Sequence, residues 1–102
     1  MSKRAKACDI PPKVRRVVHE RDSGLSIISG RPGIPNAHYI PRSAGGLGIE
    51  QNIVTLTLEE HHDYDNGGKR KEYGEKIRAY LMSKYPGWDE SKLIYRRYDY
   101  GI

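Results

Sequence analysis

Two histidines and an asparagine, His38, Asn52 and His61, stand at spacings that a hairpin and a following helix can bring together. A neutral imidazole can accept a proton near pH 7, and a second imidazole can bind a divalent cation. An amide can fix the geometry of a loop through its donor and its acceptor. These residue types would suit hydrolysis of a phosphodiester, which needs an activated water and a Lewis acid at the phosphate.

A hairpin and a helix are the elements that must position these residues. The segments "NAHYIPR" and "QNIVTLTL" are typical of strands, and the glycine loop "SAGGLG" separates them. From Glu59 the pattern becomes helical, and "NGG" at 66–68 should end that helix. The first strand would then supply His38, the returning segment Asn52, and the first helical turn His61.

Further helices are predicted on both sides of this unit. Residues 11–22 carry valines at helical spacing, with Asp9 and two prolines as start signals. A turn-rich segment, "LSIISGRPGIP", follows as a short hairpin or knuckle. A second helix is expected over 69–85 and a strand-like tail over 93–102. The chain is expected to be one α+β domain over 11–102. The apolar face predicted for the second helix is Tyr73, Ile77, Tyr80 and Leu81.

The positive charge of the chain is concentrated at its N-terminal end. Residues 1–21 hold seven Lys and Arg against two acids, whereas residues 22–102 hold eleven of each sign, so the net charge of +5 lies in the first segment. Residues 1–10 are expected to be a flexible basic arm. Such an arm favours phosphate contact, although a basic tail can also serve solubility alone. The candidate nucleic-acid contacts are Lys3, Arg4, Lys6, Arg15 and Arg16.

The cysteine count excludes two kinds of stabilising cross-link within the chain. A single cysteine, Cys8, excludes a disulfide framework and a four-thiolate zinc site within one chain. Neither a signal peptide nor an apolar stretch of membrane length is evident, so a soluble, cytoplasmic protein without membrane contact is expected.

Three segments of the chain resemble the motifs of the HNH endonuclease family, whose shared unit is a ββα-metal fold. They are "AHYIPRSAGG", "QNIVTL" and "HHDYD", and "VRRVVHERDSG" resembles the helix that often precedes this unit. The resemblance covers about residues 12–66, and residues 67–102 look like the extensions of phage and prophage members. It implies a small ββα-metal core with an N-terminal helix and a C-terminal helix plus strand-like extension. It also implies a metal-dependent endonuclease that nicks or cleaves DNA with little sequence specificity, in a bacterial host or encoded by a phage.

The resemblance also implies roles for individual residues and a cofactor. His38 would be the general base, Asn52 the brace of the loop and of the base, and His61 a metal ligand. The implied cofactor is one divalent ion, with Mg²⁺ first and Mn²⁺, Co²⁺, Ni²⁺ or Zn²⁺ as the others. The implied partners are DNA and other phage or host DNA-processing proteins, while the sequence sets no oligomeric state. The other metal candidates are Asp65, His62 and Asp63, and the implied phosphate contact is Arg42.

Two departures from the family pattern stand out. Many members carry Asp or His immediately before the general base as a metal ligand, but this chain has Ala37, which cannot coordinate an ion. Many members also hold the unit with two Cys-x-x-Cys knuckles around a structural zinc. The matching positions here contain no thiolate, so no structural zinc is expected and packing must replace its folding energy. Those positions are Ser26, Ser29, Thr57 and Glu60.

These departures leave other functions open beside a nuclease. A catalytically weakened protein on the same scaffold would hold DNA or a protein partner, such as a host nuclease, without cutting. A purely structural basic domain is the third alternative, and it predicts that His38, Asn52 and His61 do not cluster.

Overall fold

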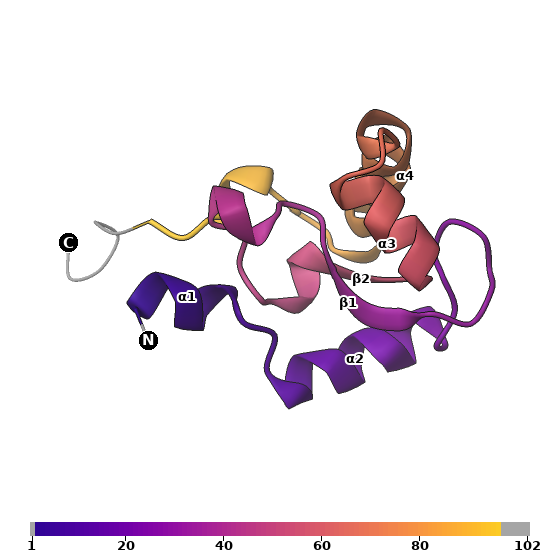
Figure 1. Cartoon of the computed structure of the whole chain (residues 1–102). Helices are drawn as coiled ribbons and strands as arrows, with labels where there is room; N and C mark the ends of the chain where they lie inside the picture. Colours follow the sequence, from indigo (N-terminus) through magenta and orange to yellow (C-terminus); the bar gives the residue numbers. More distant parts are fainter. Residues whose placement is uncertain (1, 97–102) are drawn as a thin grey trace.

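Two antiparallel strands and the helix that follows them form the centre of the structure, a computed structural model that describes residues 2–96 (Figure 1). Strand β1 (Ile34–His38) pairs with β2 (Ile53–Leu56), with His38 opposite Ile53 and an irregularity in the register earlier in β1. Helix α3 (Leu58–Asp65) begins after one intervening residue. The predicted order of strand, loop, strand and helix is therefore confirmed.

The start of α3 is fixed by a capping box. The Thr57 hydroxyl accepts from the backbone N–H of Glu60 at 3.1 Å, and the Glu60 carboxylate accepts from the backbone N–H of Thr57 at 2.9 Å. Two backbone donors that the start of a helix would leave unpaired are thus satisfied. The helix begins one residue before the predicted Glu59 and ends at Asp65, directly before "NGG".

Residues 3–8 form a helix. The prediction of a flexible arm over residues 1–10 is therefore wrong for these six residues. Helix α1 (Lys3–Cys8) has a serine cap, and Cys8 at its end is 3% exposed. Composition alone shows the charge of this segment but not the cap or the burial that holds it. Asp9, predicted to cap the next helix, instead ends α1 and pairs with Arg42 at 2.7 Å.

Helix α2 (Pro12–Asp22) follows, as predicted over residues 11–22, and ends in a buried ion pair. Arg21 Nε donates to Asp22 Oδ1 at 2.7 Å, and the two side chains are 10% and 0% exposed. Arg21 also donates to two backbone carbonyls and a tyrosine hydroxyl, while Asp22 accepts from a backbone N–H and a second tyrosine. This pair thus joins α2 to β2, to α4 and to the residue that follows α4. Its partners are Glu50, Ile53, Tyr85, Thr55 and Tyr80.

Helix α4 (Arg70–Lys84) completes the apolar core against β1, β2 and α3. Its predicted apolar face is confirmed, since Ile77 and Leu81 are fully buried and Tyr73 and Tyr80 pack at the edge of the core. Across the residues that the structure describes, no helix combines the length and the apolar character needed to cross a membrane. The buried core consists of Ala37, Val54, Leu56, Tyr64, Ile77 and Leu81.

Within residues 2–96, three short 3₁₀ helices lie in the connections: η1 (Arg42–Ala44), η2 (Glu50–Asn52) and η3 (Glu90–Lys92). After η3 the chain packs against the loop between the strands, where Ile94 forms a single antiparallel bridge with Gly46. The strand predicted over residues 93–102 is therefore reduced to one bridge in residues 93–96. Residues 97–102 lie outside the described part of the chain.

The four positions without thiolates meet in a hydrogen-bonded cluster. Ser26 is 4% exposed, and its hydroxyl donates to Glu60 Oε1 at 2.5 Å while accepting from the backbone N–H groups of Ile28 and Ser29. The same Glu60 oxygen closes the capping box with Thr57. A buried carboxylate and hydroxyls thus join the turn at residues 26–29 to the start of α3.

The substitution Glu60→Gln should destabilise the protein at neutral pH by about 1–3 kcal/mol, because it weakens hydrogen bonds to a charged acceptor. Although burial raises the pKa of Glu60, hydrogen bonds from Ser26, Ser29 and Thr57 outweigh it and hold this pKa below its ordinary value of 4.5. A carboxyl whose pKa is lower in the folded state contributes its full stability above the unfolded pKa and loses it as the pH falls through the folded pKa. The difference between Glu60→Gln and wild type should therefore shrink in acid.

Urea unfolding with chelator present, over about pH 3 to 7, measures this difference across the titration. Glu59→Gln is the matched control, because Glu59 is an exposed neighbour on the same helical turn. It should change the free energy of unfolding by less than about 0.5 kcal/mol. A deficit for Glu60→Gln that stays constant across this range would show that the charge of Glu60 does not stabilise the fold.

Candidate functional site

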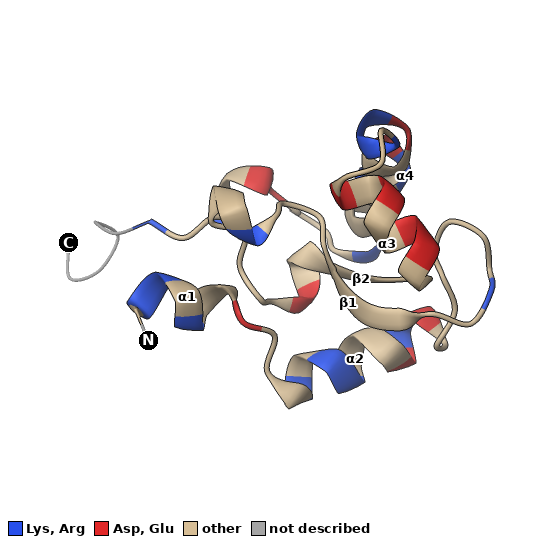
Figure 2. Ribbon diagram, in the orientation of Figure 1, with Lys and Arg blue, Asp and Glu red and all other residues tan. Residues whose placement is uncertain are grey.

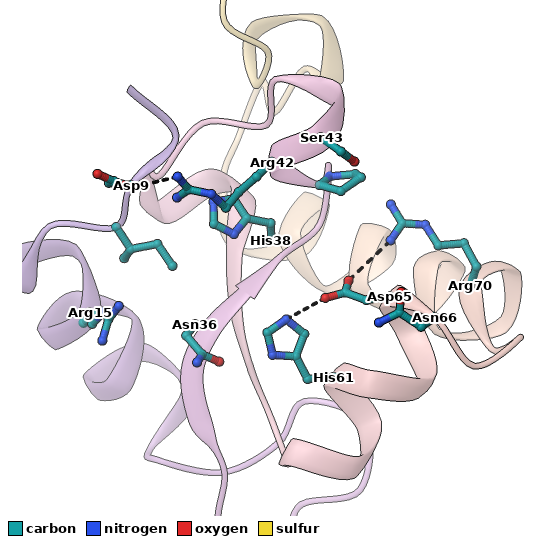
Figure 3. Close-up of a pocket in the computed structure, with 12 residues that line it drawn as sticks. Asp9, Arg15, Asn36, His38, Arg42, Ser43, His61, Asp65, Asn66 and Arg70 are labelled. Carbon is teal, nitrogen blue, oxygen red and sulfur yellow. Dashed lines mark ion pairs between the residues drawn. The ribbon is translucent and has the colours of Figure 1, made fainter. Parts of the chain in front are cut away.

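A cleft of about 880 Å³ opens between the N-terminal segment, β1 and α3 (Figure 3). The predicted base His38 and the predicted metal ligands His61 and Asp65 all line it. Asn52 is adjacent in the fold, since its carbonyl accepts from the backbone N–H of Tyr39. A purely structural basic domain was not expected to bring these three residues together. The other lining residues are Asp9, Ile10, Arg15, Asn36, Pro41, Arg42, Ser43, Asn66 and Arg70.

His38, the last residue of β1, is held by the N-terminal segment. Its Nε2 lies 2.8 Å from the backbone carbonyl oxygen of Cys8, and its side chain is in the cleft wall with the residue 8% exposed. A carbonyl oxygen can only accept, so Nε2 carries the hydrogen and the lone pair of the neutral ring is on Nδ1. Sequence reasoning missed this partner because a backbone carbonyl leaves no signal in residue type.

The electrostatic surroundings of His38 favour the neutral ring. Burial lowers the pKa of His38 below its ordinary value of 6.5, and the nearby charge of Arg42 lowers it as well. The hydrogen bond to Cys8 and the charge of Asp65 act in the opposite direction but are outweighed. The imidazole is therefore unprotonated at pH 7 and available to accept a proton.

Asn52 braces the loop between the strands, which is one part of the role that the resemblance implied. It is fully buried, and its Oδ1 accepts from the backbone N–H of Ile40 at 2.8 Å. Its Nδ2 donates to the carbonyls of Ile40 at 3.1 Å and Leu47 at 2.9 Å. Gly46 fits between these residues because a Cβ there would collide with the carbonyl of Ile40. Asn52 does not line the cleft, so it acts on the site only by holding the loop that follows His38.

His61 and Asp65 form a pair on one face of α3. His61 Nε2 lies 3.0 Å from Asp65 Oδ2, one helical turn along (Figure 3). The Arg70 guanidinium lies 3.8 Å from the other Asp65 oxygen and stacks over the Tyr64 ring at 4.1 Å.

The remaining metal candidates are not brought to the cleft. The side chain of His62 is 71% exposed, and neither His62 nor Asp63 lines it. Within the described residues, no group of three His, Cys, Asp or Glu side chains could hold a metal ion. His61 and Asp65 would therefore need a further ligand of another type.

Three arginines make the cleft wall basic, and they come from different elements. Arg15 from α2 and Arg42 were predicted as phosphate contacts, and Arg70 from α4 is the third. Arg42 donates to the carbonyl of Cys8 at 3.0 Å and pairs with Asp9. The other predicted contacts do not line the cleft, and Figure 2 shows Lys and Arg along α1 and α2 but acids on α3. Those outer residues are Lys3, Arg4, Lys6 and Arg16.

Ala37 belongs to the apolar core rather than to the cleft. It is fully buried among the core residues and pairs with Val54 in β2. Because side chains alternate along a strand, the cleft receives its neighbours Asn36 and His38. The position at which the sequence indicated a missing ligand thus faces away from His61 in this fold.

Comparison with known proteins finds no match to this chain, either among protein-family models or among curated proteins. The likeness to the HNH family therefore rests on the quoted motifs, and the function has to be argued from the geometry of the cleft.

Proposed function

We propose that this chain is a metal-dependent endonuclease of the HNH type, built on a ββα-metal core and acting on the phosphodiester bonds of DNA. One observation carries the proposal: His38, with its tautomer fixed, shares a basic cleft with the His61–Asp65 pair. Phosphodiester hydrolysis needs a proton acceptor, a site for a cation and positive charge for the flanking phosphates. The residues of this cleft can supply all three.

The donors in the cleft fit a divalent cation. His61 provides an imidazole nitrogen and Asp65 a carboxylate, only 3.0 Å apart, and a buried amide oxygen of Asn36 faces the same cleft without a hydrogen-bond partner. Mg²⁺ prefers oxygen ligands and retains waters, whereas Mn²⁺, Co²⁺ and Ni²⁺ also accept imidazole. When bound, such an ion would stabilise negative charge on the phosphate and on the leaving oxygen.

His38 performs the proton transfer in this proposal. Its Nε2–H stays on the Cys8 carbonyl, so Nδ1 accepts a proton from water as the water oxygen bonds to phosphorus. The bond from phosphorus to the leaving oxygen breaks, and that oxygen takes a proton from solvent. Arg15 and Arg42 lie where they can contact the flanking phosphates.

Cleavage of supercoiled plasmid by the full chain tests this proposal. Nicked and linear DNA should appear with Mg²⁺, Mn²⁺, Co²⁺ or Ni²⁺ and should be absent with a chelator. Single-round conversion to nicked circles before linear product would indicate a nicking enzyme. If every ion leaves the plasmid at the level of the chelated sample, the chain is not this nuclease.

The contact between Arg70 and Asp65 favours a second function, in which a protein on the same scaffold binds DNA without cutting it. The carboxylate already has a cationic partner at 3.8 Å, which would compete with a metal ion. Under this alternative the chain shifts duplex DNA in a gel with chelator present, with an affinity that falls steeply with salt, and never cuts it. Arg70→Gln separates the two functions, because it should strengthen metal-dependent cutting by a nuclease and only weaken the binding protein.

A further inference from the structure

We propose that Asn36 is a ligand of the cation site and supplies its amide oxygen beside His61 and Asp65. This inference rests on the proposed metal-dependent function, and it assigns a ligand at a position where the sequence indicated none. It also gives the site one ligand from β1 in addition to the two from α3.

The first observation is an unpaired acceptor. Asn36 Oδ1 is buried and has no hydrogen-bond partner. A buried polar atom without a partner costs folding free energy, and such atoms are uncommon unless an ion or water completes them. In the described residues the other such side-chain atom is Thr55 Oγ1, and Thr55 does not line the cleft. The unpaired oxygen thus coincides with the site already indicated by His61 and Asp65.

The second observation is the direction of the side chain. Asn36 stands two residues before His38 in β1, so both side chains lie on the cleft side of the strand. Figure 3 shows the Asn36 amide directed into the cleft on the side of His61. The strand therefore presents an oxygen ligand to the cleft at residue 36. It cannot do so at Ala37, which is packed in the core.

The chemistry of the three donors is also consistent. Carboxylate and amide oxygens are ligands for Mg²⁺ and Mn²⁺, and an imidazole nitrogen suits Mn²⁺, Co²⁺ or Ni²⁺. Two ligands from a single helical turn would hold an ion on one side only. An amide oxygen from β1 adds a ligand from the facing wall and leaves the remaining positions to water and phosphate.

Calorimetric titration with Mn²⁺, in the absence of DNA, tests this assignment. Asn36→Ala should weaken Mn²⁺ binding by about tenfold or more, while Asn36→Asp should tighten it because it adds a charged oxygen at the same place. Asn66→Ala is the matched control, because Asn66 lines the same cleft and has no buried unpaired atom. This variant should bind Mn²⁺ with the affinity of wild type. Circular dichroism melting of each variant establishes that the fold is retained.

The outcomes separate this inference from the nuclease proposal. If Asn36→Ala binds Mn²⁺ as tightly as wild type, or if wild type binds none, Asn36 is not a ligand. If Mn²⁺ binding depends on Asn36 but plasmid is never cut, the ligand assignment stands and the nuclease proposal fails. If plasmid is cut and Mn²⁺ binding ignores Asn36, the nuclease proposal stands and this inference is overturned.

Discussion

Replacing His38 with alanine should lower the rate of metal-dependent DNA cleavage by about 10²–10⁴-fold, the usual contribution of a positioned general base. The tautomer fixed by Cys8 makes His38 Nδ1 the proton acceptor, and the burial that lowers its pKa keeps it unprotonated at neutral pH. Alanine removes this proton acceptor from the cleft. Initial rates of plasmid nicking at saturating Mn²⁺ measure the effect.

The affinity for Mn²⁺ shows whether a variant that cuts DNA slowly has lost metal binding or proton transfer. His38→Ala should bind Mn²⁺ as wild type does, whereas His61→Ala should lose both Mn²⁺ binding and cleavage, because His61 is proposed as a ligand and His38 is not. His19→Ala is the matched control, since His19 is an exposed histidine on α2 outside the cleft, and it should cut at the wild-type rate. Cleavage by His38→Ala within a few-fold of wild type would rule out His38 as the base.

Residue spacing predicted part of the site because local geometry governs it. His61 and Asp65 are four residues apart, so any helix brings them to one face. His38 follows from the strand and the loop that precede this helix. Asn36 stands two residues before His38, so strand alternation places both on the cleft side, but an asparagine beside histidines did not stand out as a site residue by its type.

The spacing of apolar residues predicted the helices α2 and α4 correctly, whereas charge composition wrongly predicted that the N-terminal residues are flexible. The apolar stripes of α2 and α4 are repeats of three and four residues, and both helices form almost as expected. Charge density in residues 1–10 indicated a flexible arm, but Cys8 is buried and its carbonyl contacts His38. That contact is non-local, so nothing within the segment itself could have predicted it.

The end of α2 is a further case in which a tertiary contact decides the role of a residue. In the sequence, Arg21 stands near the end of the helix predicted over residues 11–22, and its residue type does not set it apart from the other basic residues there. In the fold, the Arg21 guanidinium donates to the carboxylate of Asp22 and to two backbone carbonyls, one in η2 and one in β2. It also donates to the hydroxyl of the tyrosine that follows α4. A planar group with five donors can satisfy such a set of acceptors at once.

Arg21→Met should therefore lower the free energy of unfolding by about 3–5 kcal/mol, the usual cost of removing one partner of a buried ion pair. The Asp22 side chain is 0% exposed, so its charge would stay buried without a counter-charge. The carbonyls of Glu50 and Ile53 would also lose their donor. Urea unfolding followed by circular dichroism measures the loss.

A loss of this size is a large share of the roughly 5–15 kcal/mol that stabilises an ordinary domain, so a milder variant is needed beside it. Arg21→Lys keeps the charge but replaces the planar fork with a single ammonium, which cannot reach Asp22, both carbonyls and Tyr85 together. It should lie between Arg21→Met and wild type. Arg16→Met, at an exposed position of the same helix, should change the free energy by less than about 0.5 kcal/mol. If Arg21→Met costs no more than Arg16→Met, the buried pair does not hold α2 to the rest of the fold.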